Sequence, residues 1–176
     1  MNKFPAIILL FLLFVSCDKL HELTQFEMDY DTSVTINSTV GINIPFNIYT
    51  PEIPTNSSSV FEVNNTRKDL IEEIKLKKLS LLITFPEDQN FNFLNSIEVY
   101  ISTNSLDEVK IAWAEDIPND EIKEINLNVN EIDLKDYIKS DSIIMRTKTI
   151  TDRLISTDTE VDIHSTFWVD ARILGL

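Results

Sequence analysis

The sequence predicts an all-β fold, an antiparallel β-sandwich of Greek-key, jelly-roll or Ig-like type with one or two short connecting helices. Three observations predict it. Apolar and polar residues alternate over short segments along most of the chain, the period of a half-buried strand. About nine such segments follow one another at spacings of roughly 10 to 15 residues, separated by turns rich in Asp, Asn and Pro. Little of the chain has helical spacing, and no internal repeat is present, so we expect a single domain.

The first strands are expected at residues 33–36 and 40–49, where β-branched and aromatic residues lie between turn formers. Pro45 lacks a backbone N–H, so the second of these strands is expected at a sheet edge or a bulge. Residues 51–59, with two prolines and three serines, are expected to form a loop before a strand at 60–63.

Thr66, followed three residues later by Asp69, has the spacing of a helix N-cap, so residues 67–73 are expected to form one or two helical turns. A meander of four alternating segments follows. These strands are expected at 79–85, 97–101, 109–113 and 125–129. Trp113 is in phase with the apolar residues of its segment, so we expect it in the core.

Residues 131–139 have apolar residues at helical spacing and are expected to form a short connecting helix. Strands are expected again at 142–151 and 159–174. The last is the most regularly patterned segment, and one of its two faces is polar and aromatic. That face carries Asp162, His164, Thr166, Trp168, Asp170 and Arg172.

Charge excludes one large class of partner. The chain has 29 Asp+Glu against 15 Lys+Arg, a formal net charge of −14, which repels nucleic acid and anionic headgroups. The densest basic stretch, residues 75–78, lies next to Glu72 and Glu73 and is interpreted as a solvated face. We therefore expect no nucleic-acid partner.

Catalytic and cofactor motifs are missing from the sequence. Gly41 and Gly175 are the only glycines, too few for a phosphate-cradling loop or a G-x-S-x-G nucleophile elbow. His21 and His164 are too few for a zinc motif. An EF-hand starting at Asp29 would need Gly and Glu where the chain has valines. We predict no catalytic residue, no cofactor and no metal; an exported hydrolase using a carboxylate pair remains the alternative.

The N-terminus has the layout of an export signal. Lys3 precedes an apolar run over residues 4–15, too short to span a bilayer, and the run ends at Ser16-Cys17. The four residues Phe14-Val15-Ser16-Cys17 resemble the lipobox of bacterial lipoproteins, with Phe14 where that family usually has Leu. The resemblance implies that residues 1–16 are removed and that Cys17 is acylated, which anchors the chain in a membrane.

This resemblance divides the chain into three parts. Residues 1–16 are the signal peptide, 17–31 the lipidated cysteine and a polar tether, and 32–176 the sandwich domain. Cys17 is the only cysteine, so no disulfide forms within the chain. The acidic stretch after it resembles the surface-export signals of Bacteroidota lipoproteins, and the chain as a whole is similar to small lipoproteins of that phylum. We expect it in the cell envelope, on the outer membrane, facing the periplasm or the surface.

Two classes of function stay open. The first is a non-catalytic binding or assembly module for an envelope protein or a glycan, and the second is an exported enzyme; a purely structural envelope protein is a further alternative. The candidate binding face carries Trp168, His164, Asp170 and Arg172, a mixture of aromatic and hydrogen-bonding groups suited to a sugar ring or a protein partner. The competing interpretation is that Trp168 packs against a cross-strand neighbour.

Overall fold

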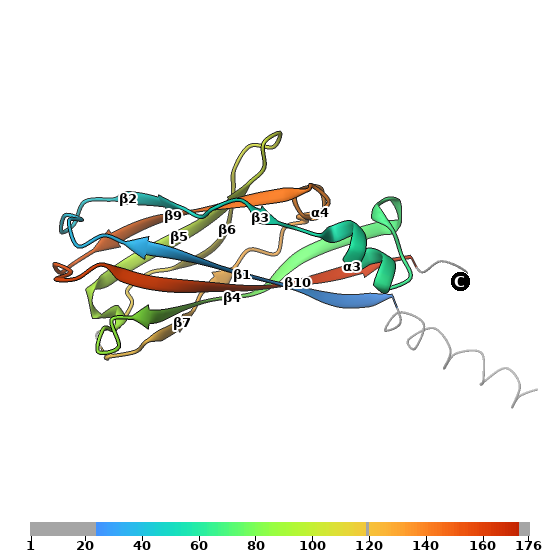
Figure 1. Ribbon diagram of the computed structural model, residues 1–176. Coiled ribbons are helices and arrows are strands. Elements are labelled where there is room, and N and C mark those ends of the chain that lie inside the picture. The colour runs from blue at the N-terminus through green and yellow to red at the C-terminus, as the bar shows by residue number, and fades with distance from the viewer. Residues whose placement is uncertain (1–23, 119, 173–176) are drawn as a thin grey trace, which may run out of the picture.

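Two antiparallel β-sheets pack face to face in the computed structural model, which describes residues 24–118 and 120–172 (Figure 1). The predicted all-β sandwich is therefore confirmed. The predicted signal peptide 1–16, Cys17, His21 and the end of the last predicted strand lie outside the described residues.

The order of strands in the two sheets defines the topology. The first sheet runs β1 (Gln25–Ile36), β10 (Thr159–Ala171), β4 (Ile71–Phe85), β7 (Glu124–Asn126). The second runs β2 (Phe46–Tyr49), β9 (Ser142–Thr151), β5 (Leu94–Ser102), β6 (Val109–Ala114), β8 (Asn128–Val129), and the short β3 (Ile53–Pro54) also pairs with β9. The last strand thus lies between β1 and β4, and the strand before it between β2 and β5. Such insertion of late strands between early ones is jelly-roll connectivity.

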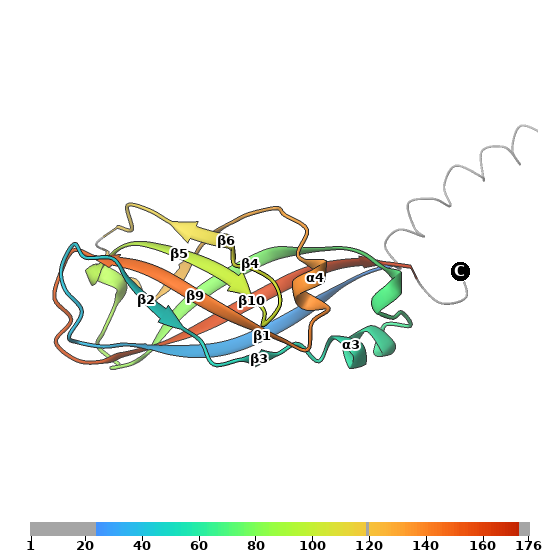
Figure 2. The ribbon, with the colours of Figure 1, turned by 90° about the horizontal axis from the view of Figure 1, so that it is seen from above.

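In the part of the chain that the structure describes, four short helical segments connect the strands. They are α3 (Ser57–Val63), the 3-10 turns η1 (Lys68–Leu70) and η2 (Phe91–Phe93), and α4 (Lys135–Ile138). Figures 1 and 2 show α3 and α4 towards the end of the sandwich where β1 begins and β10 ends. The helix predicted over 131–139 is confirmed in its second half.

The core fills the space between the two sheets, and β10 shows how the sequence specifies it. Its side chains alternate between buried and partly exposed from Thr159 to Ala171, as the pattern predicts. Phe167 and Val169 are fully buried, and Phe167 packs edge-on against Tyr30 of β1 at 5.7 Å between ring centroids. A buried aromatic contributes about 3–5 kcal/mol relative to Ala, so this inner face stabilises the whole sheet.

The tether prediction is wrong from residue 25 onward. Gln25–Ile36 is one twelve-residue strand paired with β10 along its entire length. Met28 and Tyr30 are buried, at 3% and 8% exposure, while Glu27, Asp29 and Asp31, which alternate with them, face solvent. Acidic side chains on the outer face of an edge strand look like a polar linker in sequence, which explains the error. The folded domain therefore begins before residue 32.

The strand predicted at 60–63 is also wrong, because these residues form the second half of α3. Asn56 takes a left-handed conformation (φ 47°) and its carbonyl accepts the Val60 N–H at 3.1 Å. The helix turns Phe61 fully into the core, edge-on to Phe26, and leaves Val63 81% exposed. Of the helical turn predicted over 67–73, only Lys68–Leu70 is helical, and β4 begins directly after it.

A β-bulge overturns the prediction that Trp113 lies in the core. Along the β5–β6 pair, Val99 faces Ala112 and Tyr100 faces Lys110, so Ile111 is the extra residue. Ile111 and Ala112 are consecutively buried, which inverts the alternation, and Trp113 is only partly buried. A bulge of this kind moves every later side chain to the opposite face.

Candidate functional site

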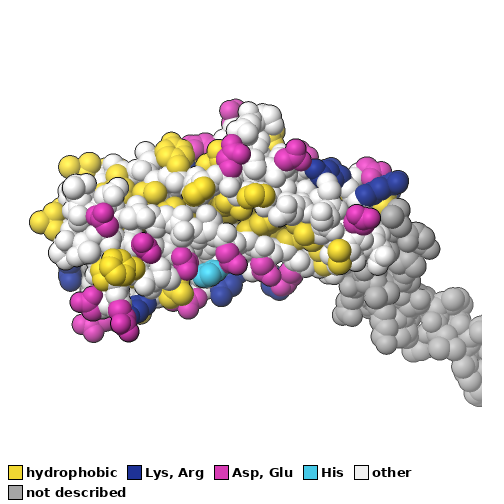
Figure 3. Space-filling model, viewed as in Figure 1, with side chains coloured by type: hydrophobic (Ala, Val, Ile, Leu, Met, Phe, Trp, Pro, Cys, Tyr) yellow, Lys and Arg dark blue, Asp and Glu magenta, His cyan; other side chains and the backbone are white. Residues whose placement is uncertain are grey.

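The predicted binding face lies on the outside of the first sheet; we call it the β10 face and define it as the outward side chains of β1, β10 and β4. On β1, Asp31 is paired with His164 and Asp29 with Thr166. On the other side of β10 lies β4, where Lys75 is paired with Trp168. An acidic row on β1 and lysines on β4 therefore flank the central strand (Figure 3).

Hydrogen bonds fix the polar side chains of this face. His164 Nδ1 lies 2.6 Å from Asp31 Oδ1, and the Thr166 hydroxyl donates to Asp29 Oδ1 at 2.7 Å. Asp170 Oδ1 accepts the hydroxyl of Thr24 at 3.2 Å. The polar groups thus pair with neighbours across the strands, which orders the surface around Trp168.

Trp168 stands in the middle of this row. Its cross-strand neighbours are Glu27 on β1 and Lys75 on β4. Lys77 forms an ion pair with Glu27, joining the strands on either side of β10. Trp168 is partly buried, and its indole makes no hydrogen bond or ring stacking within residues 24–118 and 120–172. The indole N–H therefore has no hydrogen-bond partner among these residues.

The structure brings only part of the predicted cluster together. Trp168 and Asp170 are next to each other on the outer face of β10, whereas His164 is four residues from Trp168, about 13 Å along the strand. Arg172 follows the end of β10, where its Nε donates to Glu72 Oε1 at 2.7 Å. These side chains form a row along the strand and do not converge on one point.

Sequence reasoning missed a second polar and aromatic surface, on the outside of the second sheet. The Arg146 guanidinium lies 4.1 Å from the centroid of the Tyr100 ring. Two of its nitrogens donate to the Glu108 carboxylate, each at 2.7 Å, and a third donates to Asn47 Oδ1 at 2.6 Å. The hydrogen bonds from Arg146 lower the pKa of Glu108. The contact with the Tyr100 ring and the bidentate contact with Glu108 hold this arginine in one orientation.

A second carboxylate, Glu98, organises the rest of that surface. It accepts hydrogen bonds from Lys110 at 3.1 Å, from the Tyr100 hydroxyl at 3.0 Å and from Lys148 at 3.2 Å. The bond from Lys110 is the main cause that lowers the pKa of Glu98. Lys110 also lies 5.7 Å from the Trp113 ring centroid. The alternation of Glu98 and Tyr100 with buried residues marks them as outward-facing, but their cationic partners Lys110, Lys148 and Arg146 come from other strands.

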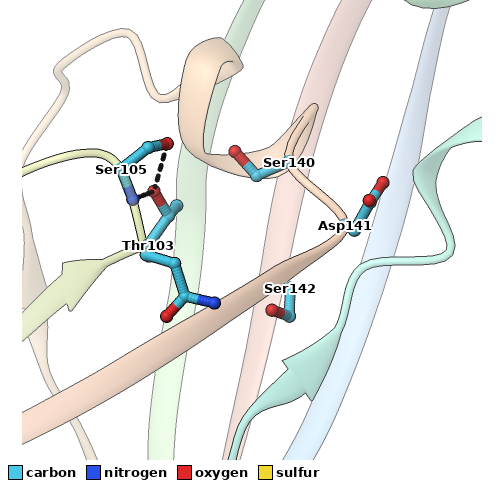
Figure 4. A pocket seen from close by; sticks show the side chains of 6 residues that line it. Thr103, Ser105, Ser140, Asp141 and Ser142 are labelled. Carbon is cyan, nitrogen blue, oxygen red and sulfur yellow. Dashed lines mark hydrogen bonds between the residues drawn. The ribbon is translucent and has the colours of Figure 1, made fainter.

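An open hollow of about 320 Å³ lies where the β5–β6 connection approaches the start of β9 (Figure 4). Its lining is polar: Thr103, Asn104, Ser105, Ser140, Asp141 and Ser142. The Thr103 hydroxyl accepts the backbone N–H groups of Ser105 and Leu106 at 3.1 and 2.9 Å, which closes the turn. These hydrogen bonds hold the turn between β5 and β6 in place. The hollow therefore follows from the shape of this connection, and we assign it no ligand.

Inside the sandwich, two hydroxyls lack partners. Thr147 and Thr149 lie on the inner face of β9, 2% and 1% exposed, and neither hydroxyl makes a hydrogen bond among the described residues. They line a narrow apolar cavity between the sheets together with residues such as Phe91 and Ile163. The volume in which the centre of a water molecule could lie is about 10 Å³, close to the minimum that a single buried water needs.

Two further properties concern ions and membranes. Within residues 24–118 and 120–172, no three His, Cys, Asp or Glu side chains are grouped so that they could hold a metal ion. The helices of this same part are all too short or too polar to cross a membrane.

Comparisons with known proteins identify no family. No family model matches the chain, and no curated protein matches it. Among solved structures, a chain of Desmodium yellow mottle tymovirus has a TM-score of 0.31 at 11% identity, covering 86% of this chain and 91% of that one. A chain of turnip yellow mosaic virus has a TM-score of 0.27 at 11% identity, covering 86% and 98%. At these TM-scores the likeness carries no argument about function.

Proposed function

We propose that the protein is a lipid-anchored cell-envelope lipoprotein that acts as a non-catalytic binding or assembly module for a protein or glycan partner. The anchor is Cys17, supported by the lipobox-like residues 14–17 and by the charged and apolar segments before them. The module is the jelly-roll sandwich. The proposal depends on how the domain is attached to its anchor.

The position of the first strand is the observation that supports this arrangement most directly. β1 begins at Gln25, opposite Asp170 near the end of β10, so the chain enters the sandwich at one end of its long axis (Figure 1). Seven residues, 18–24, separate Cys17 from β1, and fully extended they span about 25 Å. A lipid on Cys17 therefore holds the domain close to the bilayer by this end, and the loops at the other end point away.

The β10 face is the binding surface that we assign to this module. Trp168 offers a flat ring and an unpaired N–H, and the side chains around it are already hydrogen-bonded to each other. Ordered neighbours lose little conformational entropy when a partner binds. Tryptophan is also among the residues that contribute most to protein interfaces.

Membrane fractionation tests the anchor. The wild-type protein is expected in the membrane fraction and to be released by detergent, whereas Cys17→Ala is expected in the soluble fraction, because acyl chains supply the attachment. A wild-type protein that is as soluble as Cys17→Ala contradicts lipid anchoring.

Substitution of tryptophan tests the binding face. Trp168→Ala is expected to weaken binding to envelope polysaccharides, or co-purification of envelope proteins, by at least about tenfold. Trp113→Ala, on the outside of the other sheet, is the matched control and is expected to leave both unchanged. If neither substitution alters any binding, the β10 face has no such role and the purely structural alternative is favoured.

A further inference from the structure

Large apolar side chains are exposed at the end of the sandwich opposite the start of β1. Ile42 and Ile44 lie on the β1–β2 connection, Leu154 on the β9–β10 connection, and Phe85 at the end of β4; they are 40%, 62%, 71% and 53% exposed. We call this end the distal tip and define it by Phe85 and by the described residues of four connections, 37–45, 86–93, 115–118 with 120–123, and 152–158. Figure 3 shows hydrophobic and acidic side chains gathered at this end, on the left. Several large apolar side chains exposed at one end of a domain make that end a candidate interaction surface.

Hydrogen bonds hold the two connections that carry these isoleucines and Leu154. The Asn43 N–H donates to the carbonyl of Thr151 at 2.7 Å, and the Thr151 hydroxyl donates to the carbonyl of Gly41 at 3.1 Å. The Ser38 N–H donates to Asp158 Oδ1 at 2.7 Å, and this bond lowers the pKa of Asp158. The apolar side chains therefore project from loops that are bonded to each other, which reduces the entropy lost when a partner binds.

The charge around the tip restricts what can cover it. The connections 86–93, 115–123 and 152–158 carry eight Asp and Glu against Lys123 and Arg153, a net charge of −6, and 37–45 carries none. An anionic bilayer is repelled by such a surface. A second copy of this chain, docked tip to tip, would place −6 against −6, and like charges across an interface are unfavourable. Of the possible binding partners, the one that remains is a protein whose apolar surface is surrounded by lysine and arginine side chains, because its charge is opposite to that of the tip.

We infer that the distal tip docks a protein partner through an apolar surface rimmed by basic side chains. Ile42, Ile44, Leu154 and Phe85 supply the apolar contact, and the surrounding carboxylates attract the basic rim and orient it. This surface lies at the opposite end from the lipid and does not include Trp168, so the inference stands apart from the proposed function.

Defined peptides test the chemistry of the partner. The processed chain, residues 17–176 with Cys17→Ser so that no detergent is needed, is titrated into a fluorescent amphipathic Lys/Leu peptide and into a Glu/Leu peptide of the same length. We expect the Lys/Leu peptide to bind, more weakly as salt is added, and the Glu/Leu peptide not to bind. Absence of Lys/Leu binding, or equal binding of both peptides, overturns the inference.

Matched variants locate the contact. The double variant Ile44→Ser/Leu154→Ser is expected to bind the Lys/Leu peptide at least about tenfold more weakly. Val63→Ser removes an apolar side chain that is even more exposed, from α3 at the other end, and is expected to bind like the parent chain. All three positions face solvent, so folding is expected to be preserved, as far-UV circular dichroism checks. Equal losses in both variants overturn the inference.

The same variants exclude the other occupants. Sedimentation velocity is expected to give a monomer, and co-sedimentation with vesicles of phosphatidylethanolamine and one quarter phosphatidylglycerol is expected to show no binding. A dimer that the double variant dissociates would assign the tip to a second copy. Vesicle binding that the double variant abolishes would assign it to a membrane. Either result contradicts a basic protein partner.

Discussion

Tyr30 gives the sharpest test of the fold, because the sequence alone places it in a tether and the structure places it in the core. Its ring packs on Phe167 and its hydroxyl donates to the carbonyl of Thr55 at 2.8 Å. Burial raises the pKa of Tyr30, consistent with a phenol that stays neutral. Tyr30→Phe removes only the hydrogen bond, which is expected to cost about 1 kcal/mol. Tyr30→Ala also removes the ring, and the total is expected to be about 4 kcal/mol.

Urea unfolding of residues 17–176 with Cys17→Ser, followed by circular dichroism, measures both changes. In thermal unfolding of a domain of this size, a loss of about 4 kcal/mol in the free energy of unfolding corresponds to a fall in Tm of roughly 8–16 °C. Asp29→Ala is the matched control, because Asp29 lies one residue earlier on the outer face of β1 and accepts one exposed hydrogen bond. It is expected to change stability by about 0.5 kcal/mol. If Tyr30→Ala is no more destabilising than Asp29→Ala, β1 is not part of the folded sheet.

Three further substitutions probe other parts of the account. Arg146→Lys loses the stack on Tyr100 and the two-pronged contact with Glu108, so we expect a loss of about 1 kcal/mol and a Glu108 pKa, measured by NMR, that returns towards its ordinary value. The pKa of Glu98 is lowered in the folded protein, so the stabilisation that its carboxylate provides is present above pH 4.5, its ordinary pKa, and is lost as the pH falls through the lower pKa of the folded state. The urea midpoint of the wild type is therefore expected to fall as the pH drops below about 4.5, and Glu98→Gln is expected to make this fall smaller. Thr147→Val replaces an unpaired buried hydroxyl by a methyl group, and we expect a gain of up to about 1 kcal/mol; a loss would mean that the hydroxyl has a partner such as a buried water.

Regular alternation made part of the fold predictable. In β10 every second side chain is buried, and no bulge changes which of its residues face inward, so both faces followed from the sequence. β1 has the same signal, since Phe26, Met28 and Tyr30 alternate with acids, but the charged residues of its first half are equally typical of a polar linker. The bounds of β1 depend on its pairing with β10, whose paired residues lie 123 to 145 positions further along the chain and leave no local signal.

Other features depend on tertiary contacts that the sequence does not display. The bulge at Ile111 inverts the phase of β6, so Trp113 leaves the core although its spacing predicts burial. The apolar residues of α3 are as compatible with a strand as with a helix, and burial of Phe61 decides between them. The surface around Arg146 of β9 is formed by Asn47 of β2, Tyr100 of β5 and Glu108. The distal tip is likewise formed by four separate connections. The sequence supplies the residue types of such surfaces, and the topology brings them together.

The most direct measurement of the central proposal is mass spectrometry of the mature N-terminus. Protein extracted from membranes of the native host is digested with trypsin, which cleaves after Lys19, and the peptide that contains Cys17 is identified. The expected result is a chain that starts at Cys17 and carries the added mass of acyl chains on that residue. A chain that keeps residues 1–16, or an unmodified Cys17, contradicts a lipid-anchored envelope module.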